Sequence, residues 1–453
     1  MKKIFNLLLF VGILLLFTSC RGLGSETNRK AKTPDDRPNF LIIITDDQRY
    51  DTMEYMPNTQ ELIFDQGVTF SNAYITTPLC CPSRSSILTG MYAHNHGVYD
   101  NDQFLEVPTF VYYLNESGYY TGLIGKYLNT YRMNKGDTPP PEYDFWVAIS
   151  RGESRYKNPT LNIDGIWERH QGEYITTTFE NYGLKFLDQA EKKEEPFVLI
   201  FSVTAPHHPY TPAEEDKHLY FDFPMHEPPN FNEEDISDKP NWLIERNPLL
   251  TPEQIIEVER IRRFQILTLM PVDRAIKNLL DKLNEMGELD QTVIIFLSDN
   301  GHHWGEHRLF GKDTLYQESI KVPFAMRYPP LIPHPYIEDR VIGNIDIAPT
   351  LYDLAGLPIP AEVDGLSLVD LFQGEGDWRD GLLIEGWPGR GIFSAIHTGQ
   401  YIYAETVGDK SEFYDLQNDP YELENLVDDP NYLEIVAELK VLLEQMNDTT
   451  IVP

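Results

Sequence analysis

Cysteine is scarce in this chain. Of its 453 residues only 3 are cysteine, namely Cys20, Cys80 and Cys81. The last two are adjacent, so they cannot join in an ordinary long-range disulfide. A disulfide framework of the kind that braces small exported domains is therefore excluded, and the fold has to rely on its hydrophobic core. A chain of this length can bury enough apolar surface for that.

Basic residues are also few relative to acidic ones. Lys plus Arg number 37 against 71 Asp plus Glu, which gives a formal net charge of -34. Such a charge repels polyanions, so long-range attraction to nucleic acid or to anionic lipid is excluded as a function. A solvated acidic surface is enough to explain it. An anionic substrate would have to be drawn in by a local group of cations and metal.

The apolar run near the N-terminus is too short to cross a bilayer. Residues 7–17 are apolar, they follow Lys2 and Lys3, and small residues come after them. This is the pattern of a secretory signal. We therefore expect an exported protein, in the periplasm or at the cell surface.

Cys20 stands at the end of the expected signal. Residues 17–20, Phe-Thr-Ser-Cys, resemble a bacterial lipoprotein cleavage box, so Cys20 would carry a lipid as the first residue of the mature chain. The alternative is an ordinary signal peptide with a chance cysteine. We expect a signal peptide over residues 1–20, a flexible polar tether over 21–36, and membrane attachment through Cys20 alone.

Buried strands alternate with helical patterns along most of the chain. Residues 39–44, 197–203 and 292–297 are continuous apolar runs of the kind found in strands buried on both faces. Helical patterns cover residues 179–190 and 252–286, and Pro271 should kink the second helix. This alternation predicts an α/β fold, with a mostly parallel sheet flanked by helices, over a catalytic domain of residues 37–373.

The C-terminal part has a different pattern. Within residues 374–453, short strand-like pieces at 382–385 and 401–404 precede a helical pattern that includes Leu433 and Leu443. We expect a smaller α+β subdomain there, with an antiparallel sheet and a terminal helix. Residues 210–250 are rich in proline, acidic residues and aromatics, and we expect a loop that shapes the substrate pocket.

Two acidic pairs follow two of the buried strands. Asp46 and Asp47 come just after the first run, and Asp299 and Asn300 just after the run at 292–297. Because ligands of open α/β sheets bind at the carboxyl ends of the strands, these oxygen donors can converge there. Three carboxylates and an amide suit Ca²⁺ or, less well, Mg²⁺. Taken singly, each pair is equally a common turn sequence.

One motif is more specific than these pairs. Cys80, Pro82, Ser83 and Arg84 are followed by Leu-Thr-Gly at residues 88–90. This pattern resembles the signature by which the formylglycine-dependent (type I) sulfatases mark the cysteine that is oxidised to formylglycine. Cys81 stands where that motif accepts any residue, so we expect it to be a structural thiol.

The resemblance covers nearly the whole mature chain. It implies an alkaline-phosphatase-like fold, with Asp46, Asp47, Asp299, Asn300 and the modified Cys80 around a divalent cation. The N-acetylglucosamine-6-sulfatases and heparan sulfate endosulfatases are closest in three segments, at residues 79–96 with Val98, 125–129 and 344–350. A fourth segment, at residues 414–426, resembles a motif common near sulfatase C-termini.

The implied chemistry begins with Cys80. A formylglycine aldehyde hydrates to a geminal diol, one hydroxyl of which attacks sulfur while the other later expels sulfate. A metal lowers the pKa of the diol and polarises the sulfate oxygens. Pro82 suits the first turn of a helix and places Cys80 at its positive end, with Arg84 one turn along to hold the formylglycine hydroxyl. A formylglycine-generating or anaerobic sulfatase-maturating enzyme is the implied partner.

Further roles also follow from the resemblance. Lys126 and Lys312 match the cations that bind sulfate oxygens. His207, in Pro-His-His-Pro at residues 206–209, matches the histidine that contacts the leaving group, where an imidazolium can donate a proton. The adjacent His208 is the alternative.

The chain departs from the family pattern at Leu128, where many sulfatases carry a histidine that acts as a base. His94 and His96, just past the motif, are candidates to replace it or to contact substrate, although they are equally candidates for a structural role. We expect His302, His303 and Trp304 to line the pocket, with a sugar stacked on Trp304. Local packing is the alternative for these three.

Together these features predict a sulfuric ester hydrolase that acts on a sulfated saccharide, N-acetylglucosamine 6-sulfate or another polysaccharide sulfate. Two alternatives stay open from the sequence. One is a phosphonate or phosphodiester hydrolase of the same superfamily. The other is an inactive glycan-binding lipoprotein in which Cys80 is never oxidised.

Overall fold

The computed structural model describes most of the chain from Arg37 onward. The described ranges are residues 37–129, 131, 138–149, 155–220, 222–374, 378–387 and 392–447. They belong to one compact unit that runs from Asp36 to Pro453. The expected signal peptide, tether and lipid-bearing Cys20 lie outside the described residues.

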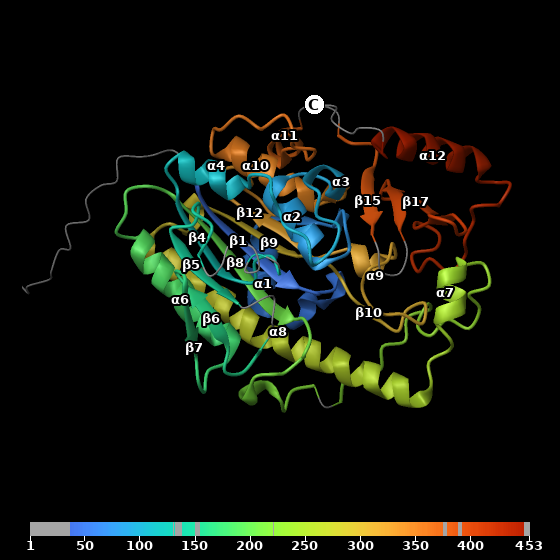
Figure 1. Cartoon of the computed structure of the whole chain (residues 1–453), viewed down its shortest axis with the longest axis horizontal. Coiled ribbons are helices and arrows are strands. Elements are labelled where there is room, and N and C mark those ends of the chain that lie inside the picture. The colour runs from blue at the N-terminus through green and yellow to red at the C-terminus, as the bar shows by residue number, and fades with distance from the viewer. Residues whose placement is uncertain are drawn as a thin grey trace, which may run out of the picture. The chain divides into compact units, whose positions relative to one another are not determined.

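A ten-stranded sheet forms the centre of this unit (Figure 1). Its strands, in spatial order, are β13 (Tyr336–Glu338), β2 (Val68–Phe70), β12 (Phe324–Arg327), β9 (Thr292–Ser298), β1 (Asn39–Asp46), β8 (Phe197–Pro206), β4 (Tyr120–Gly125), β5 (Phe145–Ile149), β6 (Thr160–Ile163) and β7 (Ile166–Arg169). From β9 to β5 all neighbours are parallel. Antiparallel pairs flank this parallel core. The predicted α/β class and mostly parallel sheet are confirmed.

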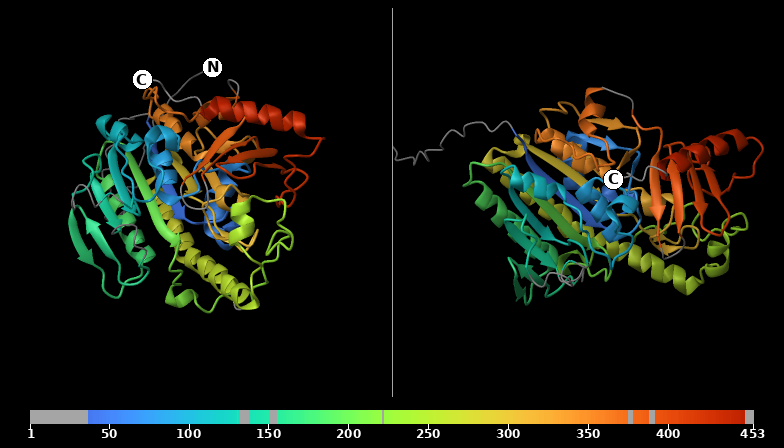
Figure 2. Two further views of the ribbon diagram at one scale, coloured as in Figure 1. Left: turned by 45° about the vertical axis from the view of Figure 1, so that its right-hand side comes forward. Right: turned by 45° about the horizontal axis from the view of Figure 1, so that its top comes forward.

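The central strand β1 shows why the sheet is covered on both faces. Every residue of β1 is buried. Leu41 and Ile43 pack into one core with α1 (Pro57–Leu62), α6 (Ile175–Ala190) and α8 (Pro252–Met286). The alternate residues, including Phe40 and Ile42, pack into a second core with α2 (Cys80–Thr89), α4 (Phe110–Glu116), α10 (Ile347–Leu354) and α11 (Leu368–Gln373). Helices therefore lie on both sides of the sheet, as Figures 1 and 2 show.

The longest helix is α8, which has the bounds expected from the sequence. The Thr251 side chain accepts from the Gln254 N–H in a capping box, and the left-handed Gly287 ends the helix. The helix continues through Pro271. No helix in the described part of the chain has both the length and the apolar composition to cross a membrane.

A four-stranded antiparallel sheet follows the large sheet in the chain. It consists of β15 (Leu382–Gly386), β16 (Phe393–His397), β17 (Tyr401–Thr406) and β18 (Glu412–Asp415), with α12 (Leu433–Asn447) packed against it. Figure 2 shows this part in orange to red. The expected small antiparallel sheet with a terminal helix is confirmed, while a boundary at residues 373/374 stays a prediction.

Short elements join these layers. They are α3 (Ala93–His96), α7 (Asn241–Arg246), α9 (Gln317–Ile320) and the two-stranded pairs β3 (Ala73–Tyr74) with β14 (Ile342–Gly343) and β10 (His303–Trp304) with β11 (Phe310–Gly311). In the expected pocket loop, residues 210–250, regular structure is limited to the short helix η3 (Glu214–Asp216) and α7 among the described residues.

Candidate active site

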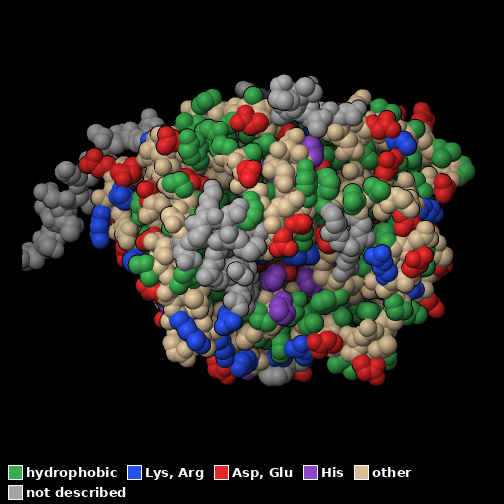
Figure 3. Space-filling view, viewed as in Figure 1, with side chains coloured by type: hydrophobic (Ala, Val, Ile, Leu, Met, Phe, Trp, Pro, Cys, Tyr) green, Lys and Arg blue, Asp and Glu red, His purple; other side chains and the backbone are tan. Residues whose placement is uncertain are grey.

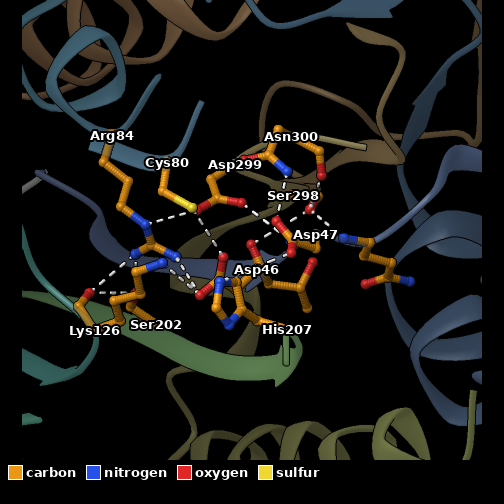
Figure 4. Close-up of polar contacts among 12 residues, drawn as sticks. Asp46, Asp47, Cys80, Arg84, Lys126, Ser202, His207, Ser298, Asp299 and Asn300 are labelled. Atoms are coloured by element: carbon orange, nitrogen blue, oxygen red, sulfur yellow. Dashed lines mark hydrogen bonds and ion pairs between the residues drawn. The ribbon is translucent and has the colours of Figure 1, made fainter. Parts of the chain in front are cut away.

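Two strand ends meet at one edge of the large sheet. β1 and β9 are parallel neighbours, with Thr45 opposite Ser298, so the residues that follow them leave the sheet together. The Asp47 backbone N–H donates to Asp299 Oδ1 at 3.2 Å, and Asn300 Nδ2 donates to Asp47 Oδ1 at 2.7 Å. The expected convergence of the two acidic pairs is therefore present in the structure (Figure 4).

Cys80 begins a helix that points at these carboxylates. Its Sγ lies 3.4 Å from Asp46 Oδ1 and 2.7 Å from Lys312 Nζ. Ligand atoms of Asp46, Asp47, Cys80 and His207 all lie within 4.8 Å of one another. Pro82 stands in the first turn of α2, and Gly90 ends the helix in the left-handed conformation. Cys80 thus lies at the positive end of a buried helix, beside the acidic group.

Each carboxylate contacts a basic side chain. Lys126 Nζ donates to Asp46 Oδ2 at 2.6 Å, Arg84 Nε donates to Asp299 Oδ2 at 2.7 Å, and Lys312 Nζ donates to Asp47 Oδ1. We call these six side chains the balanced cluster. All six side chains are buried or nearly so. Lys312 is the most exposed, with 15 % of its side chain accessible. The cluster is electrically balanced despite the acidity of the whole chain.

These contacts decide the charge states of the carboxylates. Burial alone would raise the pKa of Asp46, but Lys126, His207 and Arg84 outweigh it and hold the pKa well below its usual range. In Asp47, burial is likewise outweighed by Lys312 and His207, which lowers the pKa to about 2. Both groups are therefore anionic at neutral pH, as cation ligands have to be.

The pKa of the Cys80 thiol is shifted in the opposite direction, so that its neutral form is favoured. Burial, with the nearby Asp46 carboxylate, raises the pKa of the thiol well above its usual range, although Lys126 and Lys312 oppose this. An unmodified Cys80 is therefore protonated at neutral pH. Because the thiolate is the reactive form of cysteine, the thiol as it stands is a poor nucleophile.

The donor set around Asp46 fits a hard divalent cation. Three carboxylates and the Asn300 amide supply oxygen, and the Lys312 ammonium already contacts oxygens of both Asp47 and Asn300. Oxygen donors that gather around a positive charge are the ligand type that Ca²⁺ and Mg²⁺ prefer. Arg84 Nη2 is buried, has no hydrogen-bond partner, and lies 4.0 Å from Asp46 Oδ2, so a further oxygen acceptor fits beside it.

His207 stands at the open side of the group. Its Nε2 lies 3.9 Å from Asp47 Oδ2, and 27 % of its side chain is exposed. Its Nδ1 lies 2.8 Å from the His208 carbonyl, and the Tyr156 hydroxyl donates to the His207 carbonyl. The neighbouring His208 is exposed. Figure 3 shows histidine side chains gathered near the middle of one face of the molecule, beside acidic and basic atoms.

The three pocket candidates at residues 302–304 differ in their positions. The ring of His302 lies against Phe310, and burial, opposed by Asp47, lowers its pKa to about 4. His303 is fully buried and hydrogen-bonds Thr314, while Trp304 is 4 % exposed and donates to Gln265. The Arg49 guanidinium covers the Trp304 ring at 4.3 Å. This corrects the expectation of a sugar stacked on Trp304, because the ring packs locally and has no open face.

The two histidines past the motif are bound elsewhere. His94 Nδ1 pairs with Glu385 at 2.9 Å, and His96 Nε2 lies 3.1 Å from the Ser86 hydroxyl. The first contact holds the segment after α2 against β15 of the C-terminal sheet, and the second holds it against α2 itself. Leu128 is buried with Cys81 and Val98. These contacts favour a structural role for both His94 and His96. Cys81 likewise fits a structural thiol.

One polar residue of the site escaped the sequence pattern. Ser202, on β8, accepts from Arg84 Nη1 at 2.6 Å and donates to the Lys126 carbonyl at 2.6 Å. It thus connects the Arg84 guanidinium, which contacts Asp299, to the backbone of Lys126, whose ammonium contacts Asp46 (Figure 4). A usable signal was present, because Ser202 is a polar residue near the carboxyl end of a buried strand.

The chain matches models of known protein families and is similar to several known proteins. A family model described as "Sulfatase" matches residues 38–357, and one described as "N-sulphoglucosamine sulphohydrolase, C-terminal" matches residues 305–449. A putative extracellular sulfatase Sulf-1 homologue of Caenorhabditis elegans is 37% identical over 78% of this chain and 53% of its own length. Human N-acetylglucosamine-6-sulfatase is 34% identical over 77% of this chain and 67% of its own length. The chain thus spans about half of the first of these relatives and two thirds of the second.

A solved structure is similar over nearly all of the chain. It has a TM-score of 0.81 and 26% sequence identity, and the match covers 91% of this chain and 97% of the other. That protein was solved in complex with its substrate D-glucosamine-2-N,6-O-disulfate.

Proposed function

Because the chain belongs to the sulfatase family, we propose that it hydrolyses sulfate esters of a carbohydrate and that Cys80, oxidised to formylglycine, is the nucleophile. The observation that carries this proposal is the position of the Cys80 side chain. It lies between Asp46 and Lys312 at the start of α2, in contact with both an anion and a cation. A thiol with a purely structural role does not require contacts with a carboxylate and an ammonium.

The modification removes the obstacle that the thiol presents. The Cys80 pKa is raised by burial, so the residue offers no thiolate at neutral pH. A formylglycine at this position supplies a hydroxyl nucleophile in place of sulfur. Arg84, with its buried unpaired Nη2 near Asp46, is the side chain that we expect to hold this hydroxyl.

Lys126 and Lys312 provide the positive charge for the sulfate group. Lys312 reaches Cys80 Sγ at 2.7 Å, and Lys126 reaches the Asp46 carboxylate that lies beside the same sulfur. Burial lowers the pKa of each ammonium, but Asp47 beside Lys312 and Asp46 beside Lys126 outweigh burial and raise it. Both therefore stay charged, and a fixed charge in a dry site stabilises an anion strongly.

We propose that Asp46, Asp47, Asp299 and Asn300 hold a divalent cation, most suitably Ca²⁺. All-oxygen ligation favours Ca²⁺ over Zn²⁺. When bound, the cation polarises the sulfate oxygens and lowers the pKa of the nucleophilic hydroxyl.

His207 is the residue we assign to the leaving group. Its ring is fixed by the His208 carbonyl at Nδ1 and turns Nε2 toward Asp47, at the exposed side of the site. A protonated imidazole there can give its Nε2 proton to the departing alkoxide. His302 lies nearby against Phe310 and is our candidate for a substrate contact.

The substrate that we propose is a sulfated amino sugar such as N-acetylglucosamine 6-sulfate. Support comes from the names of the relatives and from the glucosamine disulfate in the similar solved structure. We further propose that the protein is exported, that Cys20 carries a lipid, and that a maturating enzyme oxidises Cys80.

The test combines mass and activity. Intact-peptide mass should show the Cys80 peptide lighter by about 18 Da, from conversion of a thiol to an aldehyde. The protein should release sulfate from N-acetylglucosamine 6-sulfate or a heparin oligosaccharide, and Cys80→Ala should abolish this, while Cys81→Ala should keep it. An aryl phosphodiester hydrolysed faster than an aryl sulfate, or full activity in Cys80→Ala, would show the proposal to be wrong.

A further inference from the structure

A second group of buried ionisable side chains lies where α9 meets the C-terminal part of the chain. His307 comes from the segment between β10 and β11, Glu318 from α9, and Glu422 from the segment after β18. Each offers a ligand atom within 4.8 Å of those of the other two. Their exposed fractions are 0%, 6% and 0%, so the group is closed to solvent.

Among the described residues, neither carboxylate of this group forms an ion pair with a lysine or an arginine. Glu318 Oε2 and Glu422 Oε1 are buried and have no hydrogen-bond partner. Glu318 Oε1 accepts from the Asn230 amide at 2.9 Å, and Glu422 Oε2 accepts from the Gln317 backbone N–H at 3.0 Å. Burial and the neighbouring Glu318 raise the pKa of Glu422 well above its usual range. Two buried carboxylates at this spacing are costly unless a proton or a cation lies between them.

The nearest basic groups are engaged elsewhere or lie too far away for a hydrogen bond. His303 Nδ1 is 3.8 Å from Glu318 Oε2. Lys239 Nζ donates to the backbone carbonyls of Glu422 and Leu423 and to the Tyr414 hydroxyl. By contrast, the buried Glu306 nearby in sequence pairs with Arg49 at 2.8 Å.

The orientation of His307 is that of a metal ligand. Its Nδ1 lies 2.7 Å from Glu233 Oε2, so the ring donates its N–H to that carboxylate and keeps a lone pair on Nε2, which faces the group. A histidine that ligates a metal commonly donates its other N–H to a carboxylate in this way. Nε2 lies 3.2 Å from the Asn230 amide nitrogen, and Asn230 Oδ1 is itself buried without a partner. A flip of the Asn230 side chain exchanges its amide nitrogen and oxygen. It would replace the hydrogen bond to Glu318 Oε1 with a contact of both oxygens to a bound ion.

We propose that His307 Nε2, Glu318 and Glu422, with the Asn230 amide oxygen as a fourth ligand, form a structural site for a divalent transition-metal ion of the Zn²⁺ type. One imidazole with carboxylate and amide oxygens favours Zn²⁺ over Ca²⁺. The ion joins the C-terminal segment to α9. α9 in turn supports the turn after Asp299, because the Gly301 N–H donates to the Ser319 carbonyl at 2.9 Å.

The first experiment uses the full chain without mutation. The protein is stripped with a chelator, equilibrated with excess Ca²⁺ to saturate all-oxygen sites, and titrated with Zn²⁺ alone. We expect about one Zn²⁺ per chain by elemental analysis, and a Tm that rises with Zn²⁺ concentration. Substoichiometric Zn²⁺ with an unchanged Tm would mean that the carboxylates share a proton, and would overturn the proposal.

Variants then locate the ion. Glu318→Gln and Glu422→Gln should lose Zn²⁺ and the Tm response, whereas Glu412→Gln should keep both. Glu412 is a matched control because it is equally buried and also keeps an oxygen without a hydrogen bond, but it lies outside the group of three ligand side chains; its other oxygen accepts from the Tyr316 and Tyr414 hydroxyls. Asp47→Asn should also keep Zn²⁺. If Asp47→Asn loses the ion while Glu422→Gln retains it, the ion belongs to the site at Cys80 and the proposal fails. Should a Gln variant not fold, the wild-type stoichiometry and the Asp47→Asn result still decide the question.

Discussion

Two groups of buried carboxylates lie in the described part of the chain, and their surroundings differ. At the edge of the large sheet each carboxylate has a basic partner, in the pairs Asp46–Lys126, Asp47–Lys312 and Asp299–Arg84. Near the C-terminal sheet, Glu318 and Glu422 each keep a buried oxygen without a hydrogen bond. The first group carries its own compensation, while the second needs a proton or a cation from outside.

This difference teaches how an acidic protein can accept an anionic substrate. The chain has a net charge of -34, which opposes the approach of a sulfate ester. In the balanced cluster, Lys126, Lys312 and Arg84 are placed locally around Cys80, and a bound cation would make the site positive. Local charge at contact distance outweighs the distant surface charge, because salt screens interactions beyond about 8–10 Å.

Removal of Arg84 should disturb the charge balance of the balanced cluster more than any of the other changes proposed below. Arg84→Ala leaves Asp299 buried without its partner, so we expect the free energy of unfolding to fall by about 3–5 kcal/mol and activity to be lost. Arg340→Ala is the control, because that arginine pairs with Glu338 with 44% of its side chain exposed, and its loss should cost at most about 1 kcal/mol. Chemical denaturation measures both. Equal losses in the two variants would contradict the importance of the balanced cluster.

Neutralising Asp47 tests the cation side of the same cluster. Asp47→Asn keeps the shape but removes a proposed ligand charge, so sulfatase activity should require far more Ca²⁺. We expect a loss of apparent affinity larger than the roughly 10–100-fold that removal of an outer-shell partner causes. The measurement is activity against Ca²⁺ concentration after chelation. Asp51→Asn, which alters a partly exposed partner of Arg49, should leave the curve unchanged, and a normal curve in Asp47→Asn would remove Asp47 from the ligand set.

A smaller effect is expected from Ser202, which joins the Arg84 guanidinium to the Lys126 backbone. Ser202→Ala leaves Arg84 Nη1 with one partner fewer and the Lys126 carbonyl without its hydroxyl donor. The cost of the lost hydrogen bonds is about 1–3 kcal/mol. If all of it falls on the transition state, kcat decreases by roughly 5- to 150-fold. Thr204→Val on the same strand is the control, since the buried Thr204 hydroxyl has no hydrogen-bond partner to lose. Steady-state kinetics on both variants would show whether Ser202 positions the cations.

The sequence was sufficient where a local pattern fixes the geometry. The apolar runs predict buried parallel strands, and their ends bring Asp46 and Asp299 to one edge. Pro82 and the motif around it place Cys80 at a helix start. Contacts between distant segments were not predictable in this way. Trp304 is covered by Arg49, and His94 is bound by Glu385, which is 291 residues away. No periodicity in the sequence encodes such pairings, because they depend on how loops pack after the sheet has formed.

His96 is a buried ionisable group that burial keeps neutral, unlike the charged side chains of the balanced cluster. Its Nδ1 accepts from the Val98 N–H at 3.1 Å, and burial lowers its pKa from 6.5 to about 3. The unfolded chain therefore binds a proton below pH 6.5 that the folded chain excludes, so stability is lost as pH falls from 6.5 toward 3. The slope is at most about 1.4 kcal/mol per pH unit. His96→Gln should flatten the decline in denaturant midpoint between pH 7 and pH 5, roughly within the range where His titrates, whereas the exposed control His334→Gln should follow the wild type. If His96→Gln declines as steeply as the wild type, a different buried group, such as His397, controls the acid sensitivity of the fold.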